Sequence, residues 1–537
     1  MDYLKRCKLI EQLDANIHEK NKNVALRFTN GNFNTYDLSY SELSVKINEL
    51  KLLLKEKLEC DENKLGIMVF ADDEICLPMC ILSLIYLQIP YYYVDKPNIK
   101  FSFSVCMKLD IKFYLLNEIH SKIFERQLFL FGINIVEKYQ LTSFKLYNLI
   151  IYKLDFNNVN LVVEKDFSLK EIENDSKSIM FHVTTSEDNL ERLFVRKYQV
   201  AENAPSPRLP IASKNLKSLS MSTLDDKIIN VKIDEVELYK LTVDDELIMI
   251  CPMTFDASIV QVLVMLIVGG RINYIERDKF LEYKFLYETI FEKCYTTIFQ
   301  ISPSLLKNLI DYFNENVKCE EKQYMIPENG IIRNIGIGGE KFPSCDLMKG
   351  VIHPNNQCCQ FFNLYGLTEV SAWASSKKII DIRNYEKVDL GDLFYETKFC
   401  LEEQNDNCYK LIIDSERKCY INGKRAPSLF DTGDIVQRDG DKIYFVSRDN
   451  QLIKIHTKKF NLNQIEETIH NILNIHNVVV FHNQTIVAFI ETCEQVINTN
   501  VLNNNMKFYL PDYMIPKKYI FLDKFPLNNN GNNIYYY

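Results

Sequence analysis

Short apolar runs alternate with longer helix-like segments along most of the chain. Residues 65–70, 246–251 and 296–301 are compact apolar runs with the length and composition of buried strands. Residues 258–268 and 303–313 follow two of these runs and have the length of helices. Strands that alternate with helices favour an α/β fold with a largely parallel sheet, and this is the fold class that the pattern predicts.

One apolar stretch approaches the length of a membrane span. The twenty residues from Ile75 to Val94 carry no charge, and about 20 apolar residues are needed to cross a bilayer. Pro78 and Pro90 interrupt the stretch, however, and three tyrosines crowd its end. We therefore expect a buried helix followed by a short strand, and no membrane span.

The pattern changes near residue 435. Residues 435–447 form two short alternating segments around the dipeptide Asp439–Gly440, which is typical of a tight hairpin turn. We place a domain boundary at 448–451. This gives a large N-terminal domain of residues 1–447 and a small C-terminal domain of residues 448–537.

Three polar segments are expected to lie outside regular elements. Residues 199–230 include three prolines and several small polar residues between 201 and 214, so this block is interpreted as a loop or an insertion. Residues 498–505 and 528–533 are rich in asparagine and are predicted to be surface loops.

Composition and charge place the chain among ordinary globular proteins. Of its 537 residues, 47% are hydrophobic and 25% are charged. The formal net charge is −9 and no long basic run is present. The sequence therefore lacks the electrostatic footprint of a nucleic-acid-binding protein.

The cysteines and the N-terminal residues bear on the compartment. Fifteen cysteines are scattered through the chain without the C-x-x-C spacing of metal sites. Scattered thiols in a long chain indicate a reducing compartment. The first residues are charged and amphipathic, unlike a signal peptide, so a cytoplasmic location is predicted.

The segment 361–376 carries the clearest chemistry. An apolar pair leads into Tyr365, Gly366, Thr368 and Glu369. A strand that ends in a glycine turn can present an aromatic ring, a hydroxyl and a carboxylate close together. Such groups can stack on a purine, donate to a phosphate and hold a magnesium ion. Taken alone, the same residues are equally those of an ordinary turn.

This segment is one of seven that occur in a fixed order, and together they cover nearly the whole chain. In that order they resemble the adenylate-forming superfamily, which contains acyl-CoA synthetases, peptide-synthetase adenylation domains and luciferases. Three segments, TFDAS, IGGEKFPS and VSAWAS, most resemble members that activate β-alanine. The seven segments are LSYSEL (38–43), IPYYYVD (89–95), TFDAS (254–258), IGGEKFP (337–343), NLYGLTE (363–369), DTGD (431–434) and LPDYMIP (510–516).

The resemblance implies a fold and a reaction. The fold has a large N-terminal AMP-binding domain with mixed and parallel sheets, followed by a small, mobile α+β C-terminal domain. In the reaction, the carboxylate of a small, β-alanine-like acid attacks the α-phosphorus of ATP and expels pyrophosphate, with Mg²⁺ as the cofactor. A thiol then displaces AMP. It belongs to coenzyme A or to a phosphopantetheine arm, for example on a carrier protein supplied in trans.

The resemblance also implies roles for individual residues. Tyr365 would stack on adenine, Asn363 would bond the edge of the base, and Asp434 would accept the ribose hydroxyls. Thr368 would touch the α-phosphate and Glu369 would ligate magnesium. The implied nucleotide-binding residues are Thr185, Ser186, Gly338, Gly339, Asn363, Tyr365, Gly366, Thr368, Asp434 and Arg448, and the implied catalytic residues are Thr368, Glu369 and Lys454.

Asp256 suggests the class of substrate. In amino-acid-activating members the aspartate of the TFDAS motif pairs with the substrate amino group, because a buried cation needs an opposite charge. Asp256 also precedes an apolar helical run and can cap that helix. The two roles can coexist.

The sequence departs from the family pattern at the sites that neutralise charge. In the stretch that matches the phosphate loop, the glycines are missing and Leu193 stands at the lysine position, although Arg192 or Arg196 can supply charge there. Residues 187–230 are therefore a diverged segment, an insertion or a gene-model error. In the hinge motif Asn450 replaces aspartate, while Asp449 is adjacent. Asn532 replaces the C-terminal lysine.

Two functions follow from this comparison. The first is an ATP-dependent acid–thiol ligase that activates a small carboxylic or amino acid. The second is a catalytically impaired protein of the same fold that binds nucleotide or a partner. The residues that hold the nucleotide match the family better than those that neutralise the polyphosphate.

Overall fold

The structure is a computed structural model that describes most of the 537 residues. The described residues are 15–16, 22–58, 67–70, 76–87, 89, 91–93, 111–141, 149–156, 178–184, 193–199, 238–251, 253, 256–276, 279–280, 282–367, 372–394, 397–405, 407–415, 419–421, 424–425, 429–448, 452–455, 458–473, 475, 477–482, 485–492, 497–507, 509–510, 514–523 and 525.

A nine-stranded sheet carries the larger share of the predicted motifs. Its six central strands are parallel and its edges are antiparallel. The predicted buried strands at 246–251 and 296–301 lie at its centre and are confirmed. In spatial order the strands are β16 (Asp392–Leu393), β15 (Ser375–Ile379), β14 (Gln360–Tyr365), β13 (Asn334–Gly338), β12 (Ile298–Ile301), β10 (Glu246–Met249), β11 (Arg271–Ile275), β1 (Val24–Thr29) and β2 (Thr35–Ser39).

A second nine-stranded sheet is also parallel at its centre and antiparallel at both flanks. It contains the predicted strand at 65–70 and the strand that follows the apolar stretch. In spatial order its strands are β20 (Lys424–Arg425), β19 (Cys419–Ile421), β9 (Leu193–Gln199), β8 (Ser178–Thr184), β4 (Tyr91–Tyr93), β3 (Ile67–Phe70), β5 (Phe113–Asn117), β7 (Leu149–Asp155) and β6 (Asn134–Leu141).

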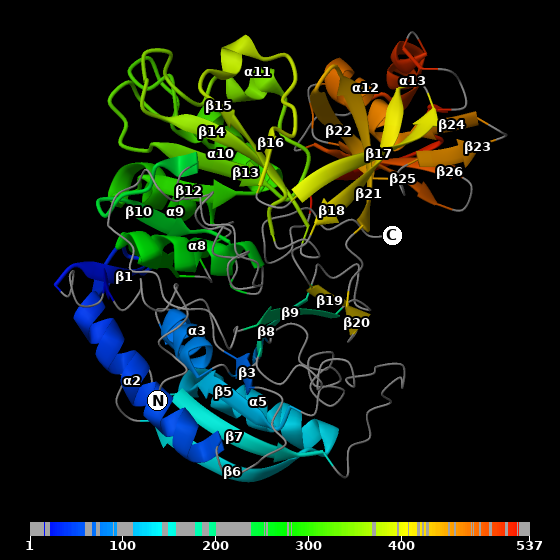
Figure 1. Ribbon diagram of the computed structural model, residues 1–537. Coiled ribbons are helices and arrows are strands. Elements are labelled where there is room, and N and C mark those ends of the chain that lie inside the picture. The colour runs from blue at the N-terminus through cyan, green and yellow to red at the C-terminus, as the bar shows by residue number, and fades with distance from the viewer. Residues whose placement is uncertain are drawn as a thin grey trace.

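Helices α2 (Tyr40–Leu58), α3 (Cys76–Tyr86) and α8 (Asp256–Val268) lie between the two sheets (Figure 1). Their buried residues join side chains of both sheets in one apolar core. The apolar stretch at 75–94 is thus a buried helix followed by a short strand, as predicted. In the described part of the chain, every helix falls short of the length and apolar character needed to cross a membrane.

The remaining helices of the large part cover the outer faces of the sheets. Among them, α10 begins with Pro303 and is capped by Ser302. The Ser302 side chain accepts a hydrogen bond from the N–H of Leu305. The predicted helix at 303–313 is therefore confirmed. The elements are α10 (Pro303–Asn316), α5 (Glu118–Phe131), α9 (Tyr283–Glu288), the π-helix η6 (Thr289–Lys293), α11 (Cys345–Met348) and the 3₁₀ helix η8 (Ile382–Asn384).

A four-stranded antiparallel sheet follows, formed by β17 (Thr397–Asn405), β18 (Cys408–Ser415), β21 (Leu429–Asp439) and β22 (Lys442–Arg448). The predicted hairpin is confirmed, because Asp439 pairs with Lys442 across the turn. Gly440 adopts a φ of 58° in this turn, a conformation that favours glycine.

The C-terminal elements form a small α+β unit. Its apolar core includes Ile465, Ala488 and Met506. An ion pair of 2.7 Å between Lys341 Nζ and Glu467 Oε1 joins the unit to the large part of the chain. The elements are β23 (Leu452–Ile455), β24 (Lys458–Asn461), α12 (Leu462–Leu473), β25 (Asn477–His482), β26 (Thr485–Glu491), α13 (Thr499–Met506) and β27 (Lys518–Leu522).

The prediction of a surface loop at 498–505 is wrong, because these residues form α13. Asn498 caps the helix by accepting hydrogen bonds from the N–H groups of Asn500 and Val501. Leu502 and Met506 are buried one turn apart, which gives the helix an apolar face. The second asparagine-rich patch, 528–533, and most of the block 199–230 lie outside the described residues.

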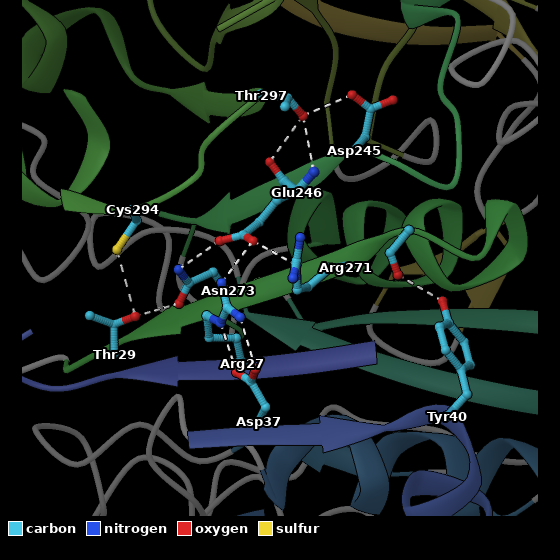
Figure 2. Close-up of polar contacts among 11 residues, drawn as sticks. Arg27, Thr29, Asp37, Tyr40, Asp245, Glu246, Arg271, Asn273, Cys294 and Thr297 are labelled. Carbon is cyan, nitrogen blue, oxygen red and sulfur yellow. Dashed lines mark hydrogen bonds and ion pairs between the residues drawn. The ribbon is translucent and has the colours of Figure 1, made fainter. Parts of the chain in front are cut away.

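A buried charge network lies at the amino-terminal ends of the parallel strands (Figure 2). Glu246, the first residue of β10, is fully buried. Its carboxylate pairs with Arg271 at 2.6 Å and with Arg27 at 3.2 Å, and it accepts a hydrogen bond of 3.0 Å from Asn273 Nδ2. Arg27 also pairs with Asp37 of β2 at 2.7 Å. Four neighbouring strands are thus joined by one set of polar contacts.

Asp245, directly before β10, extends these contacts to β12 and β13, the strands that lie beyond β10 in the sheet. Its carboxylate accepts a hydrogen bond of 2.8 Å from Thr297 Oγ1 and one of 3.1 Å from Arg333 Nε. Thr297 Oγ1 in turn accepts the N–H of Glu246 at 3.0 Å. Thr297 precedes β12 and Arg333 precedes β13, so the network connects six adjacent strands.

In the C-terminal unit, burial raises the pKa of Glu466 to about 7, although the Val479 N–H and the charge of Lys341 act in the opposite direction. The Val479 N–H donates to Glu466 Oε1 at 2.7 Å. The folded-state pKa lies above the usual unfolded value of about 4.3. The folded state therefore binds the proton more tightly, and its stability falls as the pH rises through this window.

We expect Glu246→Gln to lower the free energy of unfolding by about 3–5 kcal/mol, because it leaves Arg27 and Arg271 without their buried counter-charge. Thermal or urea unfolding of the whole chain measures this loss. As a control, Asp346→Asn breaks an exposed pair with Lys349 and should change stability by less than about 1 kcal/mol. Equal effects of the two variants would contradict a special role for the network.

We expect the C-terminal unit to lose about 1–3 kcal/mol of stability between pH 5 and pH 8 through Glu466. Hydrogen–deuterium exchange of β25 and β26, expressed as protection factors, measures this change. In Glu466→Gln the pH dependence should flatten, because an amide oxygen can still accept the Val479 N–H but does not titrate. Glu467→Gln should keep the wild-type slope, and a flattened slope there would refute the assignment to Glu466.

Candidate functional site

Two of the predicted site residues that the structure describes lie at the carboxyl ends of neighbouring parallel strands. Gly338 is the last residue of β13 and Tyr365 is the last residue of β14. The two strands pair in register, with Gly338 opposite Leu364. This end of the sheet is opposite to the Glu246 network. In parallel α/β sheets, ligands bind at the carboxyl ends of the strands.

Tyr365, Asp434 and Arg448 form a three-residue contact at this end. Tyr365 Oη donates to Asp434 Oδ2 at 2.6 Å, and Arg448 Nε pairs with Asp434 Oδ1 at 2.9 Å. Asp434 lies in β21 and Arg448 lies opposite it in β22. The contact therefore joins the nine-stranded sheet to the four-stranded sheet, and it brings together three residues that the motifs had predicted for nucleotide binding.

The protonation states in this contact are set by burial and by charge. Burial raises the pKa of Tyr365 well above its usual value, and the neighbouring Asp434 charge adds to this effect. The tyrosine therefore stays protonated and donates. Burial also raises the pKa of Asp434, while the Arg448 charge and the tyrosine hydrogen bond lower it. The paired guanidinium thus supports the carboxylate form of Asp434.

The DTGD segment is an irregular part of β21, and its hydrogen bonds fix the position of Asp434. The Asp434 N–H donates to Thr432 Oγ1 at 3.0 Å, and Arg448 Nη1 donates to the Thr432 carbonyl at 3.0 Å. Thr432 Oγ1 also donates to the Leu411 carbonyl of β18 at 2.7 Å. These bonds hold the segment against β18 on one side and β22 on the other, so the position of the Asp434 carboxylate is fixed before any ligand binds.

Asn363 lies within β14 and is 5% exposed. Its Nδ2 donates to the backbone carbonyl of Asp389 at 3.0 Å. Within the described part of the chain, no group donates to Asn363 Oδ1. The amide therefore presents its oxygen as the acceptor that is still available.

Two glycines allow close approach of backbone segments. A Cβ at Gly366 would lie 1.8 Å from the carbonyl oxygen of Ala372, which a side chain cannot tolerate. A Cβ at Gly338 would lie 2.7 Å from the Leu364 carbonyl and 2.9 Å from the Trp373 ring. Gly339 follows with a φ of 92°. Sterics thus explain why the motif carries glycine at these positions.

Glu340 ties this glycine segment to a helix. Its Oε2 accepts the N–H of Ser304 at 3.2 Å and the Ser304 hydroxyl at 2.5 Å. Ser304 lies in the first turn of α10, where backbone N–H groups lack helical partners. Burial raises the pKa of Glu340, and the two hydrogen bonds from Ser304 partly oppose this.

Several predicted site residues lie outside the described residues or have side chains that the structure does not describe. Among these, Asp256 is the first residue of α8 and Lys454 lies in β23, so their backbones are placed. Strands β8 and β9 pair as an antiparallel hairpin, with Thr184 opposite Leu193, and the predicted phosphate loop connects them. The residues outside the description are Thr185, Ser186, Thr368, Glu369 and Asn532.

The magnesium site stays a prediction. Among the described residues, no group of three or more His, Cys, Asp or Glu side chains is arranged to hold a metal ion. The predicted ligand, Glu369, follows the strand that carries Tyr365 by four positions.

Sequence reasoning missed the residues that support the site. Asp389 and Lys377 form an ion pair of 3.2 Å beside Asn363, and Phe399 packs edge-on against the Tyr365 ring at a centroid distance of 5.9 Å. The three residues lie outside all seven motifs. The cross-strand register between β14 and β15 identifies Lys377 as the neighbour of Asn363, but that register is not readable from the sequence.

Residues 221–406 match the AMP-binding enzyme family. The β-alanine-activating enzyme of Mus musculus is 24% identical over 315 residues, which are 55% of this chain and 28% of that enzyme. The matched region thus spans just over a quarter of the curated relative. The similarity to β-alanine-activating proteins that the motifs predicted is confirmed.

Solved structures share the fold over nearly the whole chain. A four-domain nonribosomal peptide synthetase bound to AMP and glycine has a TM-score of 0.65 and 19% identity, and the match covers 99% of this chain and 36% of that one. The o-succinylbenzoate coenzyme A synthetase of Bacillus subtilis, in complex with ATP and magnesium, has a TM-score of 0.62 and 12% identity, with 97% and 98% covered. The predicted fold class is confirmed.

Proposed function

We propose that this chain, a member of the adenylate-forming superfamily, binds ATP beside Tyr365 and Asp434 and activates a small carboxylic or amino acid as an acyl-adenylate. One observation carries the proposal. Tyr365, Asp434 and Arg448 come from motifs that are far apart in the sequence, yet they meet within hydrogen-bonding distance at the carboxyl end of β14. A paired, preorganised carboxylate at this position suits the hydroxyls of a ribose.

The described residues would hold the nucleoside in a fixed orientation. Asn363 Oδ1 accepts from the exocyclic amine of adenine, because its Nδ2 is already bonded to Asp389. Tyr365 offers its ring to the base while its hydroxyl stays on Asp434. The backbone at Gly338 and Gly339 can approach the nucleotide closely because neither residue has a side chain.

Neutralising the polyphosphate is the task of residues in other segments. Thr185 and Ser186, after β8, would contact the phosphates, and Thr368 would touch the α-phosphate. A magnesium ion held by Glu369 would neutralise part of the phosphate charge when bound. Lys454 in β23 would supply a cation from the C-terminal unit.

A small amino acid is the substrate class that we favour. Asp256, at the start of α8, would pair with the substrate amino group. The first turn of α8 contributes Ala257 and Val260 to an apolar cluster that also contains Leu364 and Trp373. The names of two relatives, a β-alanine-activating enzyme and a synthetase bound to AMP and glycine, support the same class.

The second half-reaction would transfer the acyl group to a thiol. The sulfur attacks the acyl carbon, the bond to the AMP oxygen breaks, and a thioester and AMP result. Coenzyme A or the phosphopantetheine arm of a carrier protein in trans is the proposed acceptor. The name of the coenzyme A synthetase and that of the peptide synthetase support one acceptor each.

A catalytically impaired nucleotide-binding protein is the second candidate. Leu193 begins β9 at the position where the resemblance expects the loop lysine, and Asn532 stands at the C-terminal lysine position. Leucine and asparagine carry no charge to offset a polyphosphate. Nucleotide binding and catalysis can therefore be separated in this chain.

We expect ATP binding together with adenylation at least roughly a hundredfold slower than in an intact relative, because one lost electrostatic donor typically costs on the order of 10²–10³ in rate. Pyrophosphate release with a panel of amino and fatty acids, beside direct ATP binding by calorimetry, measures both. Asp434→Ala should weaken binding, and Asn532→Lys should raise the rate. A family-typical wild-type rate would refute the impairment, and absent ATP binding would refute the proposed function.

We expect Asp256→Ala to abolish the response to β-alanine while ATP binding persists. Asp256→Asn separates the two proposed roles, because asparagine caps a helix as well as aspartate does but cannot pair with an ammonium group. Loss of substrate response in both variants supports charge pairing. If Asp256→Asn retains the response and Asp256→Ala only lowers thermal stability, capping explains the residue.

A further inference from the structure

Beside Asn363 lies an ion pair between a buried aspartate and a partly exposed lysine, neither of which belongs to any of the seven motifs. Asp389 Oδ2 lies 3.2 Å from Lys377 Nζ, and the Asp389 side chain is 7% exposed. Lys377 stands in β15 directly opposite Asn363 of β14. The pair is therefore placed beside the residue that is proposed to contact the base.

Asp389 makes one contact with the backbone of its own turn and one with Asn363. Its Oδ1 accepts the N–H of Gly391 at 2.9 Å, and its backbone carbonyl accepts Asn363 Nδ2 at 3.0 Å. The carboxylate thus closes a turn over residues 389–391. The carbonyl of that turn fixes which end of the Asn363 amide points away from it.

The turn is fastened to two further elements, β22 and β15. The Leu390 N–H donates to the Ile443 carbonyl of β22 at 2.8 Å, and the Leu390 carbonyl accepts Ser375 Oγ at 2.6 Å. Gly391 has a φ of 75°, and a Cβ there would lie 2.1 Å from the Ser376 carbonyl. These contacts hold the 389–391 turn in place, so the backbone carbonyl of Asp389 has little freedom to move.

An amide side chain can rotate to exchange its donor and its acceptor, and the two orientations recognise different bases. With Nδ2 held by Asp389, Asn363 offers an acceptor, which suits the 6-amino group of adenine. With the amide reversed, it would offer a donor, which suits the 6-oxo group of hypoxanthine or guanine. Burying the Asp389 charge is costly unless it is paired, and Lys377 provides that partner.

We propose that Asp389 and Lys377 are a positioning pair that locks the Asn363 amide and thereby makes the site select 6-aminopurine over 6-oxopurine nucleotides. This inference rests on the proposed function, because it concerns the same nucleotide site. Neither residue touches the nucleotide. Both act through Asn363, so the preference between two nucleotides is the quantity that they control.

The test compares ATP with inosine triphosphate, which differs from it at position 6 of the base. Dissociation constants for both nucleotides are measured by calorimetry on the full chain. Their ratio is independent of the fraction of folded protein, so loss of stability alone cannot change it. The wild-type chain should prefer ATP at least tenfold, since an unmatched hydrogen-bonding group costs about that much or more.

In Asp389→Ala the preference should fall about tenfold, mainly through weaker ATP binding. Asp389→Asn keeps an acceptor for the Gly391 N–H but loses the charge, so its preference should lie between those of wild type and Asp389→Ala. Asp381→Ala is the matched control. Asp381 likewise accepts an N–H from the residue two positions on, at 3.0 Å, and pairs with Arg383 at 2.7 Å. In the described part of the chain it makes no hydrogen bond or ion pair with Asn363, so Asp381→Ala should leave the ratio unchanged.

The outcomes separate the inference from the function on which it rests. If the wild-type chain binds neither nucleotide, the proposed function fails and the inference fails with it. If the wild-type chain prefers ATP and Asn363→Ala abolishes that preference while Asp389→Ala preserves it, the function stands and the positioning role is refuted. A wild-type chain that binds both nucleotides equally also refutes the inference.

Discussion

The buried charge of Glu246 is the constraint on which the rest of the large sheet depends. A carboxylate without solvent exposure stays ionised only if cations and donors surround it. Here these are Arg27, Arg271 and Asn273 (Figure 2). Because these groups come from β1 and β11, the strands can satisfy the charge in one register. A shift by one residue would move the partners to the opposite face of the sheet. Through Asp245 the network extends to the starts of β12 and β13, and the carboxyl end of β13 carries Gly338 of the candidate site.

The candidate site uses the opposite arrangement, in which polar groups join separate sheets rather than neighbouring strands. Tyr365 belongs to the large sheet, whereas Asp434 and Arg448 belong to the four-stranded sheet. Leu390 adds a second link, since its N–H bonds to the carbonyl of Ile443 in β22. The position proposed for the nucleotide is therefore defined by how the two sheets meet. This geometry also explains why the aromatic ring, the carboxylate and the guanidinium come from segments that are separated in the sequence.

Local sequence signals predicted individual strands, helices and turns, but they could not predict contacts between residues far apart in the sequence. The buried strand at 246–251 and the hairpin at 435–447 followed from periodicity and turn chemistry, which act over a few residues. The prediction of a loop at 498–505 is wrong because Leu502 and Met506 are spaced one helical turn apart, a signal that the asparagine-rich composition of the segment obscures. The partners of Glu246 and Asp389 could not be found. Arg27 is 219 residues from Glu246, and nothing in either local pattern indicates that these charges are buried together.

The separation of binding from charge neutralisation has a physical basis in where the residues stand. Tyr365 and Asp434 are held by strands whose positions the core and the buried ion pairs fix, so changing them disturbs packing as well as function. The residues proposed to contact the phosphates, Thr185 and Ser186, follow β8 in the sequence, and Asn532 follows β27. A chain under weak demand for catalysis would therefore lose its cations before its nucleoside contacts. Under the proposed impairment, Leu193 and Asn532 would be losses of this kind, because neither side chain carries the charge that the resemblance implies at its position.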